Sequence, residues 1–185
     1  DAALAENPIF AKAAGPLSVQ IAKVTVQGAS LEQLNAKARL QNMSLDLQEA
    51  TVRTFGGSVR TLGSFNLKSP TLAFSSQGKA SDVSGQQAFA TYFPKYKNTV
   101  EGTLGANWNV SGALYPASAR IRNLKGTAKL VATDGAFKSV DIQKSLNEAM
   151  AKVPFLKGKK NVELDNGFRS LTADLTFANG VIRAE

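Results

Sequence analysis

Apolar and polar residues alternate with a period of two along most of this 185-residue chain. The clearest run covers residues 103–114, where apolar or small residues alternate with polar or small uncharged residues. Its apolar or small positions are Leu104, Ala106, Trp108, Val110, Gly112 and Leu114. A strand of an antiparallel sheet with one apolar face and one polar face has this pattern. The run therefore predicts a half-buried antiparallel strand.

The same alternation recurs on both sides of this run. It predicts strands at residues 17–26, 34–40, 43–47, 59–67, 124–132 and 171–177, a short strand at 71–76, and roughly nine to eleven strands in all. The phase changes between Ile21 and Val24, which predicts a bulge at Ala22 and Lys23. A turn is expected near Gln41 and Asn42. The dipeptides Asp134-Gly135, Asn166-Gly167 and Asn179-Gly180 have the composition of two-residue hairpin turns.

Two segments have helical spacing instead. Residues 140–153 carry apolar side chains three and four positions apart, with Asp141 near the start and Lys152 at the end, as the helix dipole favours. Residues 84–93 form a shorter candidate with Ser84 as the N-cap and Pro94 as the stop. Residues 1–15 are interpreted as an N-terminal arm or marginal helix, and residues 16–185 as one domain.

The predicted fold is mainly β, or β-rich α+β, with about two amphipathic helices. It is a curved, twisted antiparallel sheet that forms an open groove or a half-closed sandwich. Alternation does not separate these two forms, because both need one apolar face on each strand.

Composition narrows the possible chemistry. The chain has no His and no Cys, which excludes His-dependent triads, Cys nucleophiles, Cys/His zinc sites and disulfides. Carboxylates remain, and Glu163 and Asp165 share one face of a predicted strand, although Lys159 and Lys160 can simply balance them. We expect no enzymatic activity, no metal and no cofactor. The sequence contains no run of about 18 apolar residues that would span a bilayer.

The net charge of +8 is placed unevenly. The densest basic stretch surrounds an apolar tip that includes Phe155 and Leu156; its bases are Lys152, Lys157, Lys159 and Lys160. Lysines that flank an apolar tip are typical of a loop at an anionic membrane surface, where each base contributes about 1 kcal/mol. The alternative is that the tip packs on the core and the lysines are only exposed. No nucleic-acid-binding motif accompanies the positive charge, so nucleic acid is not an expected partner.

Several motifs, taken in order, resemble the AsmA-like family over residues 16–185. They are Phe55-Gly56-Gly57 opening a strand; alternating Leu124 to Leu130 followed by Asp134-Gly135 and Val140-Asp141-Ile142; and alternating Leu171 to Phe177 followed by Asn179-Gly180. The resemblance implies bacterial envelope proteins held in the inner membrane by an N-terminal helix, with most of the chain in the periplasm. It also implies kinship with repeating β-groove proteins that carry phospholipid tails along an apolar channel, without catalysis.

On this basis we expect a lipid-handling module for phospholipid transport or outer-membrane lipid homeostasis, as a piece of a longer chain. The residues expected to face acyl chains are Leu104, Trp108, Val110, Leu130, Leu171, Leu175 and Phe177. Those expected near headgroups or a membrane surface are Lys157, Lys159, Lys160, Phe155 and Leu156. The alternative is a structural module with a closed core that supports outer-membrane biogenesis through contacts with other envelope proteins. The two differ in whether the apolar strand faces are covered.

Overall fold

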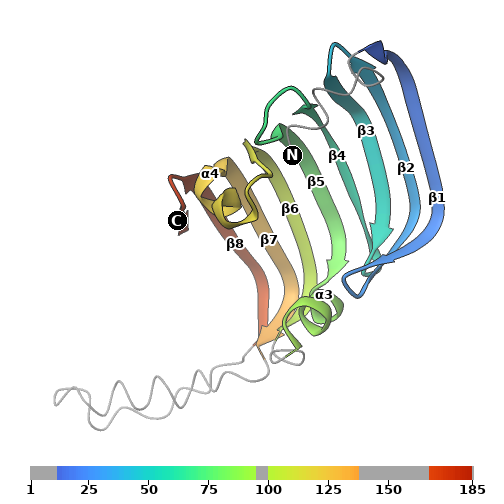
Figure 1. Cartoon of the computed structure of the whole chain (residues 1–185). Helices are drawn as coiled ribbons and strands as arrows, with labels where there is room; N and C mark the ends of the chain where they lie inside the picture. Colours follow the sequence, from blue (N-terminus) through green and yellow to red (C-terminus); the bar gives the residue numbers. More distant parts are fainter. Residues whose placement is uncertain (1–11, 95–99, 138–166, 185) are drawn as a thin grey trace, which may run out of the picture.

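The computed structural model describes residues 12–94, 100–137 and 167–184. These residues form nine antiparallel strands in one sheet, whose spatial order follows the sequence. The strands are β1 (Gly15–Val26), β2 (Ala29–Gln41), β3 (Ser44–Thr54), β4 (Gly57–Asn66), β5 (Ala73–Ser84), β6 (Val100–Ala113), β7 (Lys125–Phe137), β8 (Gly167–Ala178) and β9 (Val181–Ala184). The sheet is bowed and twisted, and β1 lies far from β8 (Figure 1). The prediction of a mainly β, antiparallel fold is confirmed.

Two-residue turns join four of the strand pairs. Both residues have positive φ in each of Gln27-Gly28, Asn42-Met43, Phe55-Gly56 and Asn179-Gly180, and the flanking residues pair directly. This backbone geometry is that of type I′ turns, which match the right-handed twist of the strands they connect. The predicted turn at Asn179-Gly180 is confirmed, and the turn predicted near Gln41 and Asn42 lies one residue further along.

The predicted hairpin turn at Asp134-Gly135 is wrong. These two residues lie inside β7 and face Gly102 alone, since Glu101 pairs with Ala136 and Thr103 with Thr133. Asp134 has a φ of 48°, which places it in the left-handed region that such a bulge uses. The dipeptide thus bends a continuing strand instead of reversing it. Asn166 of the third predicted turn lies outside the described residues.

Bulges with left-handed residues occur toward one end of the sheet. Ser81 and Asp82 of β5 together face Gly105, and β2 carries an extra residue at Gln33. The bulge predicted at Ala22 and Lys23 is wrong, because β1 keeps one register with β2 on both sides of Ala22. The register shift lies in β2, between Glu32 and Asn35, where β2 pairs with β3. Bulges increase local twist and bend the strand, so these strands bend as they approach the same end.

Helix α3 (Gly85–Tyr92) follows β5 at this end, and we call it the α3 end (Figure 1). The Ser84 hydroxyl accepts a hydrogen bond from the Gln87 N–H at 3.3 Å, so the predicted N-cap is confirmed. The rings of Phe55 and Tyr92 meet edge to face at 5.7 Å. A side chain on Gly28, at the tip of the β1–β2 hairpin, would contact Thr91 of α3. The helix and two hairpin tips therefore meet at this end.

The opposite end of the sheet, here called the α4 end, carries the connection from β6 to β7. This connection contains a 3₁₀ turn (Ala117–Ala119) and the short helix α4 (Arg120–Asn123). Within the described residues, the longest helix is α3 with eight residues, and α4 has only four residues. The expectation of about two amphipathic helices is therefore too high for this part of the chain. The helix predicted at residues 140–153 lies outside it.

Strand β5 is much longer than the short strand predicted at 71–76. The middle of the strand contains Gly78, which pairs directly with Trp108 of the neighbouring strand. A methyl group at Gly78 would overlap the Trp108 ring. The apolar surface at this place comes from β6, and for this reason β5 itself lacks the alternation that marks the other strands.

A closed core is absent from the described part of the chain. Only Ala29 and Met43 are buried apolar residues there, with relative exposures of 1% and 4%. All nine described strands belong to one sheet, so they form no second layer of a sandwich. The fold is an open single-layer sheet with elements gathered at its two ends.

Candidate functional site

The register of β6, β7 and β8 brings all seven predicted chain-contacting residues to one face of the sheet. Cross-strand rows run Leu104–Ala132–Leu171, Ala106–Leu130–Ala173, Trp108–Ala128–Leu175 and Val110–Gly126–Phe177. Residues that pair directly across neighbouring strands point to the same side. We call this side the apolar face.

The apolar face continues across the other strands. Phe65 of β4 and Phe74 of β5 form a cross-strand pair with stacked rings, 6.4 Å between centroids. Leu17, Val19 and Ile21 of β1 lie in register with alternate residues of β2 at the edge of the sheet. The apolar face therefore extends well beyond β6, β7 and β8, the three strands that carry the predicted chain-contacting residues.

This face is accessible. Leu17 is 47% exposed, and Leu130 and Leu171 are 42% and 44% exposed. Monomeric soluble proteins seldom leave a contiguous apolar surface of many residues open to water, and such patches mark interaction or ligand sites. Within the described residues, large parts of the apolar strand faces are therefore uncovered.

An apolar pocket of about 510 Å³ lies on this face near the α3 end. Leu104, Leu130, Leu171 and Phe168 line it from the strands, and Phe89 of α3 forms part of its wall. Sequence reasoning missed Phe89, although the helix itself was predicted. An eight-residue helix has too few turns for periodicity to identify which side packs on the sheet.

Trp108 is held in place by a short chain of hydrogen bonds on the apolar face. Its indole Nε1–H donates to the Ser76 hydroxyl at 3.0 Å, and that oxygen lies 3.1 Å from the Thr61 hydroxyl. Thr61 Oγ1 in turn donates to the backbone carbonyl of Gln77 at 3.0 Å. Because the indole N–H has its partner within the sheet, the ring presents its apolar surface outward.

The other side of the sheet, the polar face, has a different character. Its cross-strand rows near the centre contain Gln77, Asn109, Thr127 and Thr176, and Lys79, Asn107, Lys129 and Asp174. Arg60 and Glu49 form an ion pair at 3.0 Å on it. Leu62 of β4, which pairs with Gln77, is an isolated large apolar side chain on this face and is 46% exposed.

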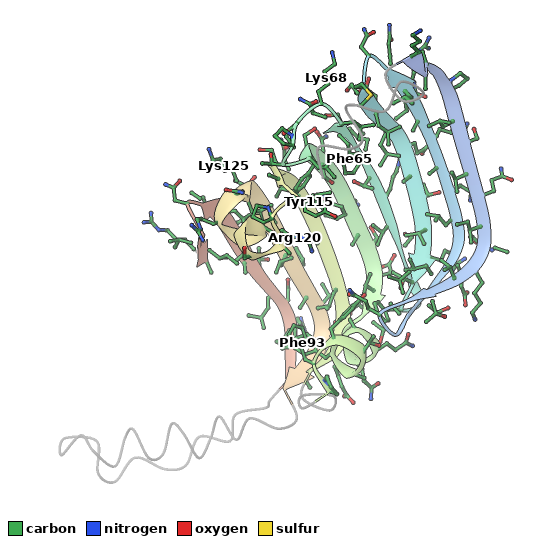
Figure 2. The ribbon with its side chains drawn as sticks, in the orientation of Figure 1. Phe65, Lys68, Phe93, Tyr115, Arg120 and Lys125 are labelled. Atoms are coloured by element: carbon green, nitrogen blue, oxygen red, sulfur yellow. The ribbon has the colours of Figure 1, made fainter. Side chains whose placement is uncertain are left out.

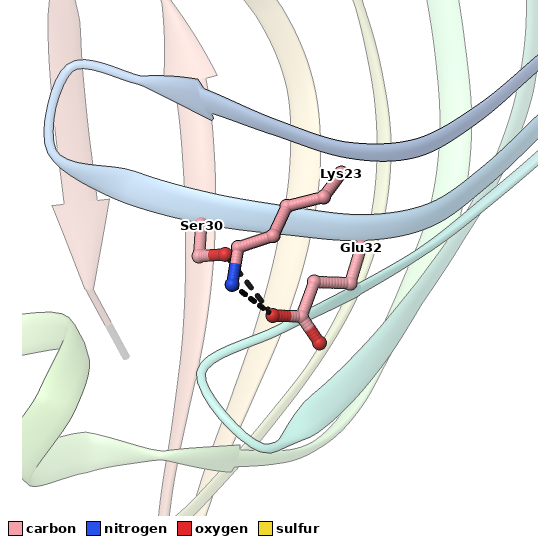
Figure 3. Close-up of polar contacts among 3 residues, drawn as sticks. All are labelled: Lys23, Ser30 and Glu32. Atoms are coloured by element: carbon pink, nitrogen blue, oxygen red, sulfur yellow. Dashed lines mark hydrogen bonds and ion pairs between the residues drawn. The ribbon is translucent and has the colours of Figure 1, made fainter.

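An ion pair joins the two strands of the first hairpin close to the bend in β2. Lys23 Nζ lies 3.0 Å from Glu32 Oε1, and the Ser30 hydroxyl donates to the same oxygen at 3.2 Å (Figure 3). The hydrogen bond from Lys23, followed by its positive charge, lowers the pKa of Glu32 below its ordinary value. The pair therefore favours the ionised carboxylate at this bend.

Charge differs between the two ends of the strands. We define each rim as the three strand residues nearest that end together with the connections beyond them. Among the described residues, the α4 rim holds one acid, Asp46, and the bases Lys12, Arg39, Lys68, Arg120, Arg122, Lys125 and Arg183; the α3 rim holds Arg53, Arg169, Asp82 and Glu101. Lys68, Arg120 and Lys125 lie at different points along the α4 end, while Phe93 lies at the other end (Figure 2). In the described part of the chain, the α4 rim is therefore strongly basic and the charges of the α3 rim balance.

The model of the AsmA family matches residues 2–185. The chain belongs to the AsmA family. Proteins of this family are associated with the bacterial envelope. No curated protein and no solved structure matches the chain significantly.

Other predicted features of this AsmA-family chain fall partly outside the structure. Lys157, Lys159, Lys160, Phe155 and Leu156 lie beyond the described residues, as do the carboxylates at 163 and 165. In the ranges 12–94, 100–137 and 167–184, no three acidic side chains come together as a metal site. No helix in those ranges is long and apolar enough to cross a membrane.

Proposed function

We propose that this AsmA-family chain is a passive carrier of lipid acyl chains. In this proposal it takes part in phospholipid transport or outer-membrane lipid homeostasis in the periplasm, within a protein anchored to the inner membrane by an N-terminal helix. The observation that carries the proposal is the apolar face, which spans neighbouring strands and keeps Leu130 and Leu171 more than 40% exposed.

The physical basis is burial of hydrocarbon. Each methylene transferred from water to an apolar surface contributes about 0.8 kcal/mol. The pocket of about 510 Å³ beside Phe89 lies within the usual range of ligand pockets, roughly 300–1,000 Å³. Acyl chains that lie on a surface shared by consecutive strands can move across it without crossing water. The proposed role includes no covalent step.

Trp108 supplies an internal probe, because it is the only tryptophan of the chain. Its indole ring lies on the proposed contact surface, beside Ser76. Phosphatidylcholine vesicles whose acyl chains carry bromine quench tryptophan only on close contact. We expect such vesicles to quench Trp108 in the wild-type protein, while unbrominated vesicles leave its emission intact.

A matched pair of variants tests whether the face matters. Leu171→Asp places a charge on the apolar face, and Leu62→Asp places the same charge on the polar face; the two leucines are 44% and 46% exposed. Because both positions are open to water, both variants should fold. We expect Leu171→Asp to abolish most quenching and Leu62→Asp to preserve it. Equal behaviour of the two variants, or absence of quenching in the wild type, would refute the proposal and favour the structural and assembly role.

A further inference from the structure

The described part of the α4 rim holds seven bases and one acid, Asp46. The ion pairs of the described residues join Lys23 to Glu32, Arg60 to Glu49 and Lys129 to Asp174, and none of these lies in the α4 rim. Unpaired bases of one sign raise the local concentration of anions. An anionic partner is therefore the chemistry that this rim favours.

Two of the bases line a pocket at the α4 end of the sheet, and the strand residues in its wall come from both faces. This pocket, of about 840 Å³, has Arg122 and Lys125 in its wall, together with Asn123 and Asn179. Phe74, whose ring stacks on Phe65 of the apolar face, lines it as well. Cations and amides next to an aromatic surface suit a ligand that is anionic at one end and apolar at the other.

The backbone fixes how these residues are placed. The Cα atom of Arg122 lies 3.4 Å from where a methyl group on Gly180 would be, so α4 packs against the β8–β9 turn. Arg120 Nε donates to the Leu114 carbonyl at 2.8 Å, which ties α4 to the start of its own connection. The cations are thus carried by an anchored segment.

The spacing along β7 fits one lipid. Lys125 pairs with Ser111 in the polar-face rows at the end of β7, and the apolar-face positions of this strand begin at the next residue, Gly126. From Gly126 to Leu130 the strand rises by about 13 Å, at roughly 3.3 Å per residue. The hydrocarbon of one bilayer leaflet is about 15 Å thick, half of the bilayer core. A phosphate at Arg122 and Lys125 would therefore place the attached chain along β6–β8, with its end at the pocket beside Phe89.

From these observations we infer that the α4 rim binds the phosphate of anionic lipid headgroups and makes the protein prefer anionic over zwitterionic lipids. This inference rests on the proposed function, since it assumes that acyl chains occupy the apolar face. It differs from the expectation for Lys157, Lys159 and Lys160. Those lysines lie outside the described residues, in the sequence between the end of β7 at Phe137 and the start of β8 at Gly167.

The test compares two lipids and two double variants. Phosphatidylglycerol and phosphatidylcholine vesicles with the same brominated chains are titrated against Trp108 at low salt, and the ratio of the two apparent affinities is the readout. Arg122→Glu with Lys125→Glu removes two bases of the α4 rim. Arg53→Glu with Arg169→Glu is the matched control, because it changes the net charge equally at the α3 rim.

We expect the wild type to prefer phosphatidylglycerol, and the α4-rim variant to lower this preference by about thirtyfold, because each of the two bases contributes about 1 kcal/mol near an anionic surface. The α3-rim control should lower it by less than about threefold. The wild-type preference should fall toward unity at 1 M salt, where the screening length is about 3 Å. Quenching by phosphatidylcholine should persist in both variants, which verifies that they fold and still bind chains.

The outcomes separate the two proposals. Absence of quenching with either lipid in the wild type overturns the proposed function, and this inference with it. Quenching by both lipids with no preference overturns the inference alone. An equal loss of preference in the two double variants also overturns it, because net charge and not the α4 rim would then be responsible.

Discussion

The two ends of the sheet differ in how they use one unusual backbone conformation. Turns at both ends adopt positive φ between strands and reverse the chain: Asn42-Met43 and Asn179-Gly180 at the α4 end, and Gln27-Gly28 and Phe55-Gly56 at the α3 end. Close to the α3 end, Gln33, Asp82 and Asp134 adopt it within strands, which continue and bend. Among the described residues, the α3 end also carries a helix and its rim is neutral in charge, whereas the rim at the α4 end is strongly basic. A residue with positive φ thus forms part of a turn where the chain reverses, and part of a bulge where its strand and the neighbouring strand both continue.

The largest expected effect concerns the bend in β7. Gly102 has a φ of +112°, and a methyl group there would lie 2.6 Å from Gly135 Cα and 2.7 Å from the Thr133 carbonyl. Gly102→Ala should lower the free energy of unfolding by about 3 kcal/mol, since it combines backbone strain with a backbone overlap. Urea denaturation measures this change.

Gly105→Ala is the control for that variant, because a methyl group at Gly105 would be no closer than 3.6 Å to any neighbour. Its effect on unfolding should stay within about 1 kcal/mol. Equal stability of the two variants would mean that close packing of glycines does not define the bend at the α3 end.

An intermediate effect is expected from aromatic residues at opposite ends of the apolar face. Phe89 lines the pocket near the α3 end and Phe74 lines the pocket at the α4 end. If headgroups lie at the α4 end, Phe89→Ala should weaken binding of long-chain lipids by about tenfold and of short-chain lipids much less, given the free energy of burying an aromatic side chain. Phe74→Ala should weaken both to a similar degree. Trp108 quenching by brominated lipids of two chain lengths measures this, and the reverse pattern would place the lipid in the opposite orientation.

The smallest expected effect is the pH response of the first hairpin. Because Lys23 lowers the pKa of Glu32, the carboxylate stabilises the folded hairpin above the pKa it has in the unfolded chain. This contribution is lost as the pH falls through the folded-state pKa. Lys23→Ala should raise the pKa of Glu32 toward its ordinary value, as followed by NMR titration, whereas Lys37→Ala should leave it in place. An unchanged Glu32 pKa in Lys23→Ala would show that the ion pair is absent in solution.

Much of the sheet could be predicted because each strand carries its own signal. The alternation in β6, β7 and β8 assigned Leu104, Leu130 and Leu171 to one side of their strands, and the register places these sides together. Ser84 and Pro94 marked the ends of α3, since an N-cap hydroxyl and a proline act within one turn of the helix.

The remaining features depend on contacts between segments far apart in sequence. Asp134-Gly135 has the composition of a turn, and only the continued pairing of β7 with β6 and β8 makes it a bulge. The length of β5 was hidden because Trp108 of another strand fills the space at Gly78. The α4 rim collects single bases from several strands and connections, so no local cluster in the sequence marks it.

The order of strands in the sheet has a consequence for how the molecule gains and loses structure. Since each strand packs mainly on the strands next to it in sequence, the sheet is a linear array of hairpins. In such an array, stability is close to a sum of local terms and nearest-neighbour terms. Opening then starts at the outer strands and proceeds inward one hairpin at a time. For the same reason, two strands with their turn can be added or removed as a unit, which lengthens or shortens the apolar face while every other pairing stays the same.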